Sequence, residues 1–273
     1  MDPTHKSHSK IDKHWLKAEH WKTLDCDKET LILSDDKIFY TIEGEGEYTG
    51  YPSVFMRLAM CNLTCKGFAS EDSPHGCDSF ISWSVKNKMT FNEIFEFMED
   101  KRIVDKLIDG AILKITGGEP LIQQKQLLKF MACFIKKYEH HPVIDFETNA
   151  TILPDERWLS EFYASFTTSP KLTNNGDPEE KSYKPEVLKW HREAGSGFKF
   201  VISSDKDIEE IWAKYVENKT VSIPKERIWF MPCCGSRQEH IDRAPAVAEY
   251  AKAMNVNFSP RLHLLIWDMA LKV

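Results

Sequence analysis

The chain lacks the features that suit a membrane or a nucleic acid. No apolar run approaches the roughly 20 residues of a membrane-spanning helix, and the polar start MDPTHKSHSKIDKHW has no apolar segment of the kind found in signal peptides. The 36 Lys and Arg residues are outnumbered by 42 Asp and Glu residues, which leaves a net charge of −6 and no basic footprint for phosphates. The sequence therefore predicts a cytoplasmic protein that acts on a small molecule, with no nucleic acid or membrane partner.

A disulfide framework is also not expected. The chain has seven cysteines, an odd number, and shows no secretion signal. Cys26 and Cys133 are therefore expected to be buried, inert thiols, the second of them in an apolar helix. No internal repeat is evident. The remaining cysteines raise the question of metal ligation.

Short apolar runs rich in β-branched and aromatic residues alternate with amphipathic helical patterns from residue 37 onward. This alternation predicts βα units around a parallel sheet. The expected strands are 53–58, 111–116, 143–148, 165–168, 198–203, 227–232 and 257–264, and the expected helices are 90–100, 122–138, 155–164, 184–194, 205–218 and 238–254. About six such units are fewer than the eight of a closed barrel, so an incomplete barrel or an open doubly wound sheet is expected. Residues 1–33 are interpreted as a polar N-terminal extension and residues 34–273 as one domain.

Three cysteines lie in the loop after the first expected strand. Cys61, Cys65 and Cys77 have the spacing C-x3-C-x11-C. Thiolates are the natural ligands of iron–sulfur clusters, and three of them leave one iron open to an external ligand. A zinc site that also uses His75 would normally show closely spaced ligand pairs, which this segment lacks. The spacing therefore favours an iron–sulfur site with catalytic chemistry.

Other unusual residues also follow expected strands. The segments are TGGEP at 116–120, ETN at 147–149, SPK at 169–171 and MPCCG at 231–235. Because the active sites of such folds lie at the carboxyl ends of the strands, these loops are expected to converge on one site.

Together these segments resemble the 7-carboxy-7-deazaguanine synthase family of radical S-adenosylmethionine (SAM) enzymes. The other segments that carry the resemblance are FYTIEGEGEYTG at 39–50, VFMRL at 54–58, the cysteine loop with Trp83, and SPRLHLLIW at 259–267. They occur in the family's order from about residue 37 to the C-terminus. The resemblance implies an incomplete (β/α)6-type barrel and a homodimer. It also implies conversion of 6-carboxy-5,6,7,8-tetrahydropterin to 7-carboxy-7-deazaguanine with loss of ammonia.

The resemblance further implies a [4Fe–4S] cluster, SAM, Mg²⁺ and an electron donor such as flavodoxin or ferredoxin. Cys61, Cys65 and Cys77 would ligate the cluster, and Ser79 would ligate Mg²⁺. The cluster would transfer an electron to SAM and release a 5′-deoxyadenosyl radical. The implied SAM contacts are Gly76, Asp78, Gly118, Ser169, Pro170, Lys171, Met231, Pro232, Cys233 and Cys234.

The substrate contacts implied by the resemblance come from several segments. They are Ile42, Glu43, Gly44, Glu45, Arg57, Thr116 and His263. A carboxylate at Glu45 can pair with the N–H groups of the pterin's amino-pyrimidinone edge, and the planar fork of Arg57 suits the substrate carboxylate. The alternative for His263 is a buried histidine in a strand. For Lys171 the alternative is a solvated surface charge.

The chain departs from the family pattern in three places. Eleven residues separate the second and third cysteines where the family more often has two. Gly76 stands where an aromatic residue often packs near the SAM adenine, a role that Phe68 or Phe80 can take. Glu43 replaces the commoner glutamine. Its side chain either alters substrate affinity or faces solvent.

Two other functions remain open from the sequence. The first is another radical SAM activity on the same scaffold, such as activation of a glycyl-radical partner protein, because the cysteine loop and GGEP are shared across that superfamily. The second is a zinc-stabilised binding module without enzymatic activity. The EGEG loop and the segment around His263 favour the deazaguanine synthase over the glycyl-radical activator.

Overall fold

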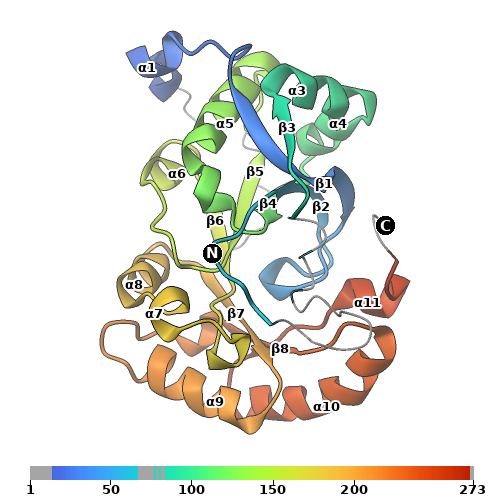
Figure 1. Cartoon of the computed structure of the whole chain (residues 1–273), viewed down its shortest axis with the longest axis vertical. Coiled ribbons are helices and arrows are strands. Elements are labelled where there is room, and N and C mark those ends of the chain that lie inside the picture. The colour runs from blue at the N-terminus through green and yellow to red at the C-terminus, as the bar shows by residue number, and fades with distance from the viewer. Residues whose placement is uncertain (1–13, 67–76, 78–79, 81–83, 271–273) are drawn as a thin grey trace.

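A single mixed sheet organises the protein (Figure 1). The computed structural model describes residues 14–66, 77, 80 and 84–270, and within these residues the sheet has nine strands in the order β3-β1-β2-β4-β5-β6-β7-β8-β9. The strands are β1 (Thr30–Ile42), β2 (Pro52–Leu58), β3 (Asn87–Thr90), β4 (Ile112–Gly117), β5 (Val143–Thr148), β6 (Ser165–Thr168), β7 (Gly197–Ile202), β8 (Ile228–Pro232) and β9 (Asn257–Phe258).

The strand directions match an incomplete barrel. Strands β2 and β4 to β9 are parallel to their neighbours, whereas β1 is antiparallel to β2 and β3 is antiparallel to β1. β3 and β9 stand at opposite ends of the order instead of closing it. The predicted fold class is therefore confirmed.

Helices follow the parallel strands and cover the outer face of the sheet (Figure 1). They are α1 (Glu19–Lys22), α3 (Phe91–Asp100), α4 (Ile103–Ile108), α5 (Gln124–Tyr138), α6 (Arg157–Ser160), α7 (Glu179–Ser182), α8 (Pro185–Glu193), α9 (Asp205–Ile211), α10 (Arg237–Met254) and α11 (Leu262–Trp267). The chain continues from α9 as a π-helix over Trp212–Val216. Short 3-10 helices span His14–Lys17, Gly46–Tyr48, Pro120–Gln123, Thr173–Asn175 and Lys225–Arg227.

Side chains alternate between the two faces of each strand. In β4, Leu113 and Ile115 belong to the apolar core beneath the helices, while Lys114 and Thr116 project from the opposite face. Phe146 of β5 likewise lies in the core. We call the face that carries Lys114 the inner face of the sheet. Its polar character separates it from the apolar, helix-covered face.

Several elements differ from the prediction. The strand expected at 257–264 is wrong beyond Phe258, because Pro260 cannot donate a ladder hydrogen bond and Leu262–Trp267 forms α11. Short apolar runs of this kind do not distinguish strand from helix. Strands β1 and β3 were not expected at all. The helix expected at 155–164 is reduced to Arg157–Ser160.

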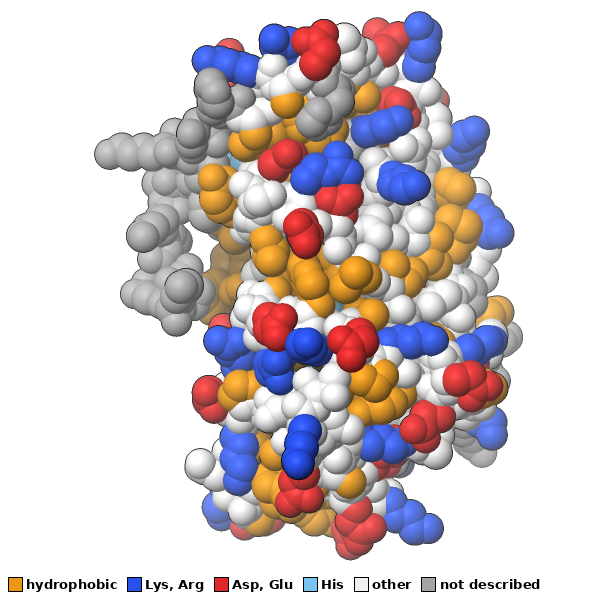
Figure 2. Space-filling model, turned by 90° about the vertical axis from the view of Figure 1, so that its left-hand side faces the viewer, with side chains coloured by type: hydrophobic (Ala, Val, Ile, Leu, Met, Phe, Trp, Pro, Cys, Tyr) orange, Lys and Arg blue, Asp and Glu red, His pale blue; other side chains and the backbone are white. Residues whose placement is uncertain are grey.

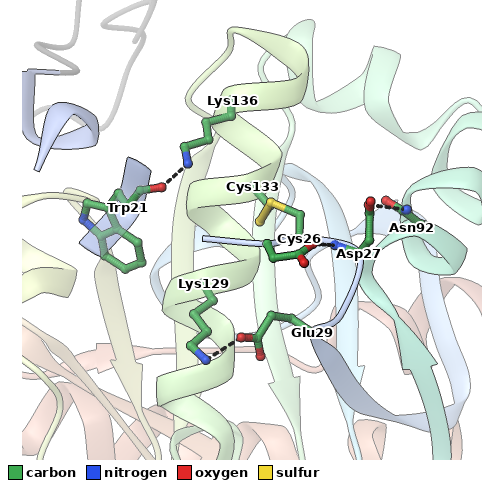
Figure 3. Close-up of a disulfide and its surroundings, with 9 residues drawn as sticks. Trp21, Cys26, Asp27, Glu29, Asn92, Lys129, Cys133 and Lys136 are labelled. Atoms are coloured by element: carbon green, nitrogen blue, oxygen red, sulfur yellow. Dashed lines mark hydrogen bonds and ion pairs between the residues drawn. A yellow bond between two sulfur atoms is a disulfide. The ribbon is translucent and has the colours of Figure 1, made fainter. Parts of the chain in front are cut away.

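The N-terminal segment packs along α5, and Figure 3 shows its attachments. Cys26 and Cys133 form a disulfide with Cα atoms 6.0 Å apart, so the expectation of two free thiols was wrong. The chain positions are 107 residues apart, and cysteine parity carries no information about which side chains the fold brings together. Glu29 pairs with Lys129 at 2.6 Å, and Trp21 is buried in the core. Strand β1 begins inside the predicted extension.

The surface carries charges of both signs. On the face shown in Figure 2, basic and acidic side chains are interspersed around hydrophobic ones. Within the described part of the chain, the helices are too short or too polar to cross a membrane.

Candidate functional site

The cysteine loop follows β2 at the carboxyl edge of the sheet. Cys61, Cys65 and Cys77 lie outside the disulfide and are partly exposed. Burial raises the pKa of Cys61 to about 11 and also raises that of Cys65. Cys65 also raises the pKa of Cys61, and Cys77 raises the pKa of Cys65. The Lys171 ammonium has the opposite effect and lowers the pKa of both Cys61 and Cys65. Cys61 and Cys65 therefore both lie within the electrostatic influence of Lys171.

Hydrogen bonds anchor this loop to the segment after β6. The backbone N–H of Thr64 donates to Asp177 Oδ2 at 2.8 Å, and the Thr64 hydroxyl donates to Oδ1 at 2.6 Å. The Lys66 N–H donates to the Asn175 carbonyl at 2.7 Å. The Asn175 amide lies 3.9 Å from Cys65 Sγ. These bonds fix Cys65 relative to a distant part of the chain.

A second loop packs directly against the first. Gly118 donates its N–H to the Leu58 carbonyl at 3.1 Å, and a Cβ at Gly118 would lie 2.0 Å from the Met60 carbonyl oxygen. Only glycine permits this backbone approach. Glu119 is buried beside it and accepts N–H bonds from Leu121 and Asn149 at 3.1 and 2.8 Å. Burial raises the pKa of Glu119 to about 7.

The loop after β6 brings the predicted SPK segment to the same edge. The Ser169 N–H donates to the Thr148 carbonyl at 2.7 Å, and Lys171 Nζ donates to Ser169 Oγ at 3.1 Å. Pro170 between them is buried. Lys171 is half-buried and its charge acts on Cys61 and Cys65, which favours a role beside the cysteine loop over a solvated surface charge.

The loop after β8 is joined to the inner face by an arginine. Met231 and Pro232 end β8, and the Cys233 N–H donates to the Ile202 carbonyl at 2.9 Å. The Arg261 guanidinium donates to the Cys234 carbonyl. The same guanidinium reaches Glu45 Oε1, with Nε at 2.8 Å.

Charged groups of the inner face form a network around Glu45. Lys199 Nζ of β7 lies 2.5 Å from Glu45 Oε2 and also contacts Glu147 of β5. Burial raises the pKa of Glu147, but the Lys199 and Lys114 ammonium groups and the Lys199 hydrogen bond together lower it to about 2. The Lys199 ammonium and Arg261 hold the pKa of Glu45 well below its usual range against the effect of burial. Both carboxylates are therefore ionised.

The EGEG loop lies against the C-terminal helix. The Leu262 N–H donates to the Gly44 carbonyl at 2.9 Å, and a Cβ at Gly44 would lie 2.2 Å from His263 Nδ1. His263 Nε2 is 3.9 Å from Glu45 Oε1. His263 thus lies in α11 with a partly exposed side chain, and its alternative as a buried strand histidine was wrong.

Other predicted substrate contacts lie on neighbouring strands. Thr116 Oγ1 donates to Glu147 Oε2 at 3.1 Å, and the Arg57 guanidinium lies 5.8 Å from the centre of the Phe39 ring. Ile42 ends β1. Glu43 is buried, so the alternative that it faces solvent was wrong.

Several predicted residues lie outside the described part of the chain. These are Gly76, Asp78 and Ser79, together with Phe68, His75 and Trp83. Within the described residues, no three His, Cys, Asp or Glu side chains are arranged around a single metal-ion position.

The prediction missed the charges that surround Glu45. Lys114, Asp145 and Lys199 were not assigned to the site, and Glu147 and Arg261 appeared only as parts of motifs. Each of the first three interrupts an otherwise apolar strand, as in Phe198-Lys199-Phe200. A charge in that position signals an inward-facing polar group, because burial of an unpaired charge is costly.

Comparisons with known proteins agree with this arrangement. Residues 42–153 match the family model for a 4Fe-4S single cluster domain. The chain is 30% identical over 239 residues to the 7-carboxy-7-deazaguanine synthase of Pyrobaculum aerophilum, covering 86% of this chain and 94% of that protein. It is 29% identical over 242 residues to the synthase of Hyperthermus butylicus, covering 86% and 93%. The fold is similar to the crystal structure of QueE from Escherichia coli, with a TM-score of 0.58 and 19% identity over 86% of this chain and 95% of the other.

Proposed function

This chain belongs to the 7-carboxy-7-deazaguanine synthase family of radical SAM enzymes, and we propose that it converts 6-carboxy-5,6,7,8-tetrahydropterin to 7-carboxy-7-deazaguanine with release of ammonia. One observation carries the proposal: the cysteine loop follows β2 at the carboxyl edge of the sheet whose inner face holds carboxylates kept ionised by cations. A radical-generating centre would thus stand beside groups suited to a polar ring.

The donor set fits a cluster and SAM. Cys61, Cys65 and Cys77 would hold three irons, since thiolate is the usual ligand of such clusters. When bound, the [4Fe–4S] cluster would supply the electron that cleaves SAM to methionine and a 5′-deoxyadenosyl radical. Gly118 lets its loop pack against the Met60 carbonyl, where a side chain would collide, and its backbone would contact SAM. The positive charge of Lys171 would favour the thiolate forms.

The inner face would orient the pterin. Glu45 would accept N–H bonds from the amino-pyrimidinone edge, because Lys199 and Arg261 keep it ionised and each carboxylate oxygen retains acceptor capacity. Arg57 would meet the substrate carboxylate through its planar fork. Thr116 and His263 would complete the contacts. Mg²⁺ on Ser79, a flavodoxin or ferredoxin as reductant, and a homodimer belong to the same proposal.

The product assay tests this function. Anaerobically reconstituted protein is incubated with the pterin, SAM and dithionite, and the products are identified by mass spectrometry. We expect 7-carboxy-7-deazaguanine and ammonia. Formation of 5′-deoxyadenosine without the deazaguanine would contradict the proposal and would favour another radical SAM activity, such as activation of a glycyl-radical partner protein.

The ligand assignment has a matched pair of variants. Cys77→Ala should abolish SAM cleavage and lose the broad visible absorbance of the cluster, because one iron loses its ligand. Cys133→Ala, which removes a cysteine distant from this loop, should retain both per mole of folded protein. Retention of cleavage by Cys77→Ala would refute the assignment, and stoichiometric zinc without iron or sulfide in the purified protein would favour the binding module.

A further inference from the structure

A buried group of three charged residues lies beneath the EGEG loop. Lys114 Nζ of β4 is 2.6 Å from Asp145 Oδ2 of β5 and 2.9 Å from Glu43 Oε2. The three side chains are 1%, 0% and 6% exposed. A buried charge that loses its partner costs several kcal/mol, so this ion group constrains all three positions.

The second oxygen of Glu43 organises the loop itself. Oε1 accepts the backbone N–H of Gly44 at 2.9 Å and that of Glu45 at 3.1 Å. The Glu43 backbone closes the base of the loop, with its N–H bonded to the Tyr51 carbonyl and its carbonyl accepting the Gly50 N–H, both at 2.8 Å. The Glu43 side chain therefore holds the chain direction at Glu45.

Lys114 requires a carboxylate at this position. Glu43 faces donors on both oxygens, namely the ammonium on one side and two backbone N–H groups on the other. A glutamine would turn its NH₂ group toward one of these donors, because an amide offers one acceptor oxygen only. Asp145 has hydrogen-bond donors besides Lys114, because it also accepts the Ser165 and Thr167 hydroxyls at 2.7 and 3.0 Å.

We propose that Lys114 is a positioning residue for the pterin, acting through Glu43 and the Gly44 and Glu45 N–H groups to set the direction of the Glu45 carboxylate. This inference rests on the proposed function, because it takes Glu45 as the group that meets the amino-pyrimidinone edge. It changes the role of the Glu43 side chain from a ligand contact to a support of the loop. Burial raises the pKa of Glu43 and the Lys114 ammonium opposes that effect, which agrees with the pairing.

Equilibrium binding to the protein tests the proposal without turnover. Binding of the pterin and of SAM is measured by calorimetry under anaerobic conditions for the wild type, Glu43→Gln, Lys114→Met and the neutral triple variant Glu43→Gln/Lys114→Met/Asp145→Asn. We expect the two single variants to bind the pterin about tenfold or more weakly and SAM unchanged. The triple variant should recover much of the pterin affinity, because the amide introduced at position 43 no longer faces an ammonium and a neutral core replaces the ion group.

Three outcomes separate the possibilities. If the wild type does not bind the pterin, the proposed function fails, and with it the basis of this inference. If the wild type binds and both single variants bind equally well, Lys114 has no positioning role. If the single variants weaken pterin and SAM binding together, in proportion to a fall in thermal midpoint, the ion group is merely structural and the proposal is overturned.

Discussion

At the scale of single residues, charged side chains occupy inner-face positions of strands whose neighbouring residues lie in the apolar core. Lys114 and Lys199 each lie between apolar core residues, yet each finds two carboxylates on the inner face. Paired burial of this kind adds little net stability compared with an apolar core, but loss of one partner is costly. These residues are therefore best explained by the chemistry they arrange.

His191 of α8 illustrates the opposite case, a buried histidine without a charged partner in the described structure. Its ring packs edge-on against Phe166 and Trp190, and Nδ1 lies 3.1 Å from Ser196 Oγ. Burial lowers the pKa of His191 to about 3. In the unfolded chain the pKa of this histidine is near 6.5. On acidification the unfolded state therefore takes up the proton before the folded state does. The stabilising contribution is thus present above about pH 6.5 and is lost as the pH falls toward 3.

Because of this residue, we expect the unfolding free energy to fall by about 2 kcal/mol when the pH is lowered from 7 to 5. Denaturant unfolding at the two pH values measures the drop in the wild type and in His191→Phe, which should lose correspondingly less. Phe162→Leu, at a buried residue that does not titrate, is the control and should keep the full drop. An equal drop in His191→Phe and wild type would contradict the expectation.

At the scale of elements, helix starts follow local rules. Thr90 precedes α3 as a capping box, with the Glu93 N–H donating to Thr90 Oγ1 at 3.2 Å and the Thr90 N–H donating to Glu93 Oε2 at 2.7 Å. The Thr-x-x-Glu pattern ahead of Phe91 and Ile94 is the sequence signature of such a start. Helix α9 begins in a similar way, because Asp207 accepts the Ser204 N–H at 2.8 Å.

Thr90→Ala should lower the unfolding free energy by about 1 kcal/mol, because an orphan N–H of the first turn loses its acceptor. Ser160→Ala is a suitable control, since the exposed Ser160 hydroxyl only donates back to the Glu156 carbonyl of the preceding turn. Urea unfolding at neutral pH compares the two. A loss at Ser160 as large as that at Thr90 would remove the cap as the explanation.

At the scale of the whole molecule, residues 14–29 are attached to the rest of the chain by several contacts. The disulfide, the Glu29–Lys129 pair and the contact of Lys136 with the Trp21 carbonyl fasten this segment along α5 (Figure 3). The centre of the Trp15 ring lies 4.6 Å from that of Phe162. Because the disulfide closes a loop of more than 100 residues, it restricts the unfolded chain strongly.

Removal of this disulfide should lower the unfolding free energy by about 2–5 kcal/mol. Thermal unfolding with and without reductant measures the effect in the wild type, and Cys133→Ala should show the lower midpoint in both conditions. A reductant effect of equal size in Cys133→Ala would mean that another reducible group is responsible. The same measurement tests whether the segment before β1 is an extension or a part of the fold.

The sequence by itself determined the periodic and local features of this protein. Alternating βα patterns, the capping residue Thr90 and the spacing of Cys61 and Cys65 depend on neighbours along the chain, so they can be seen without the fold. The antiparallel strands β1 and β3, the short α6 and the helix at 262–267 were not predicted, because packing decides such short or mixed segments.

The tertiary structure alone decided which distant residues meet. The pairing of Cys26 with Cys133, the ions around Glu45 and the support of Glu43 by Lys114 join segments from 52 to 216 positions apart. A strand pattern shows that a charge points inward, but the partner depends on sheet order and register. For this reason the candidate site could be located from the sequence, while the network that holds it could only be found in three dimensions.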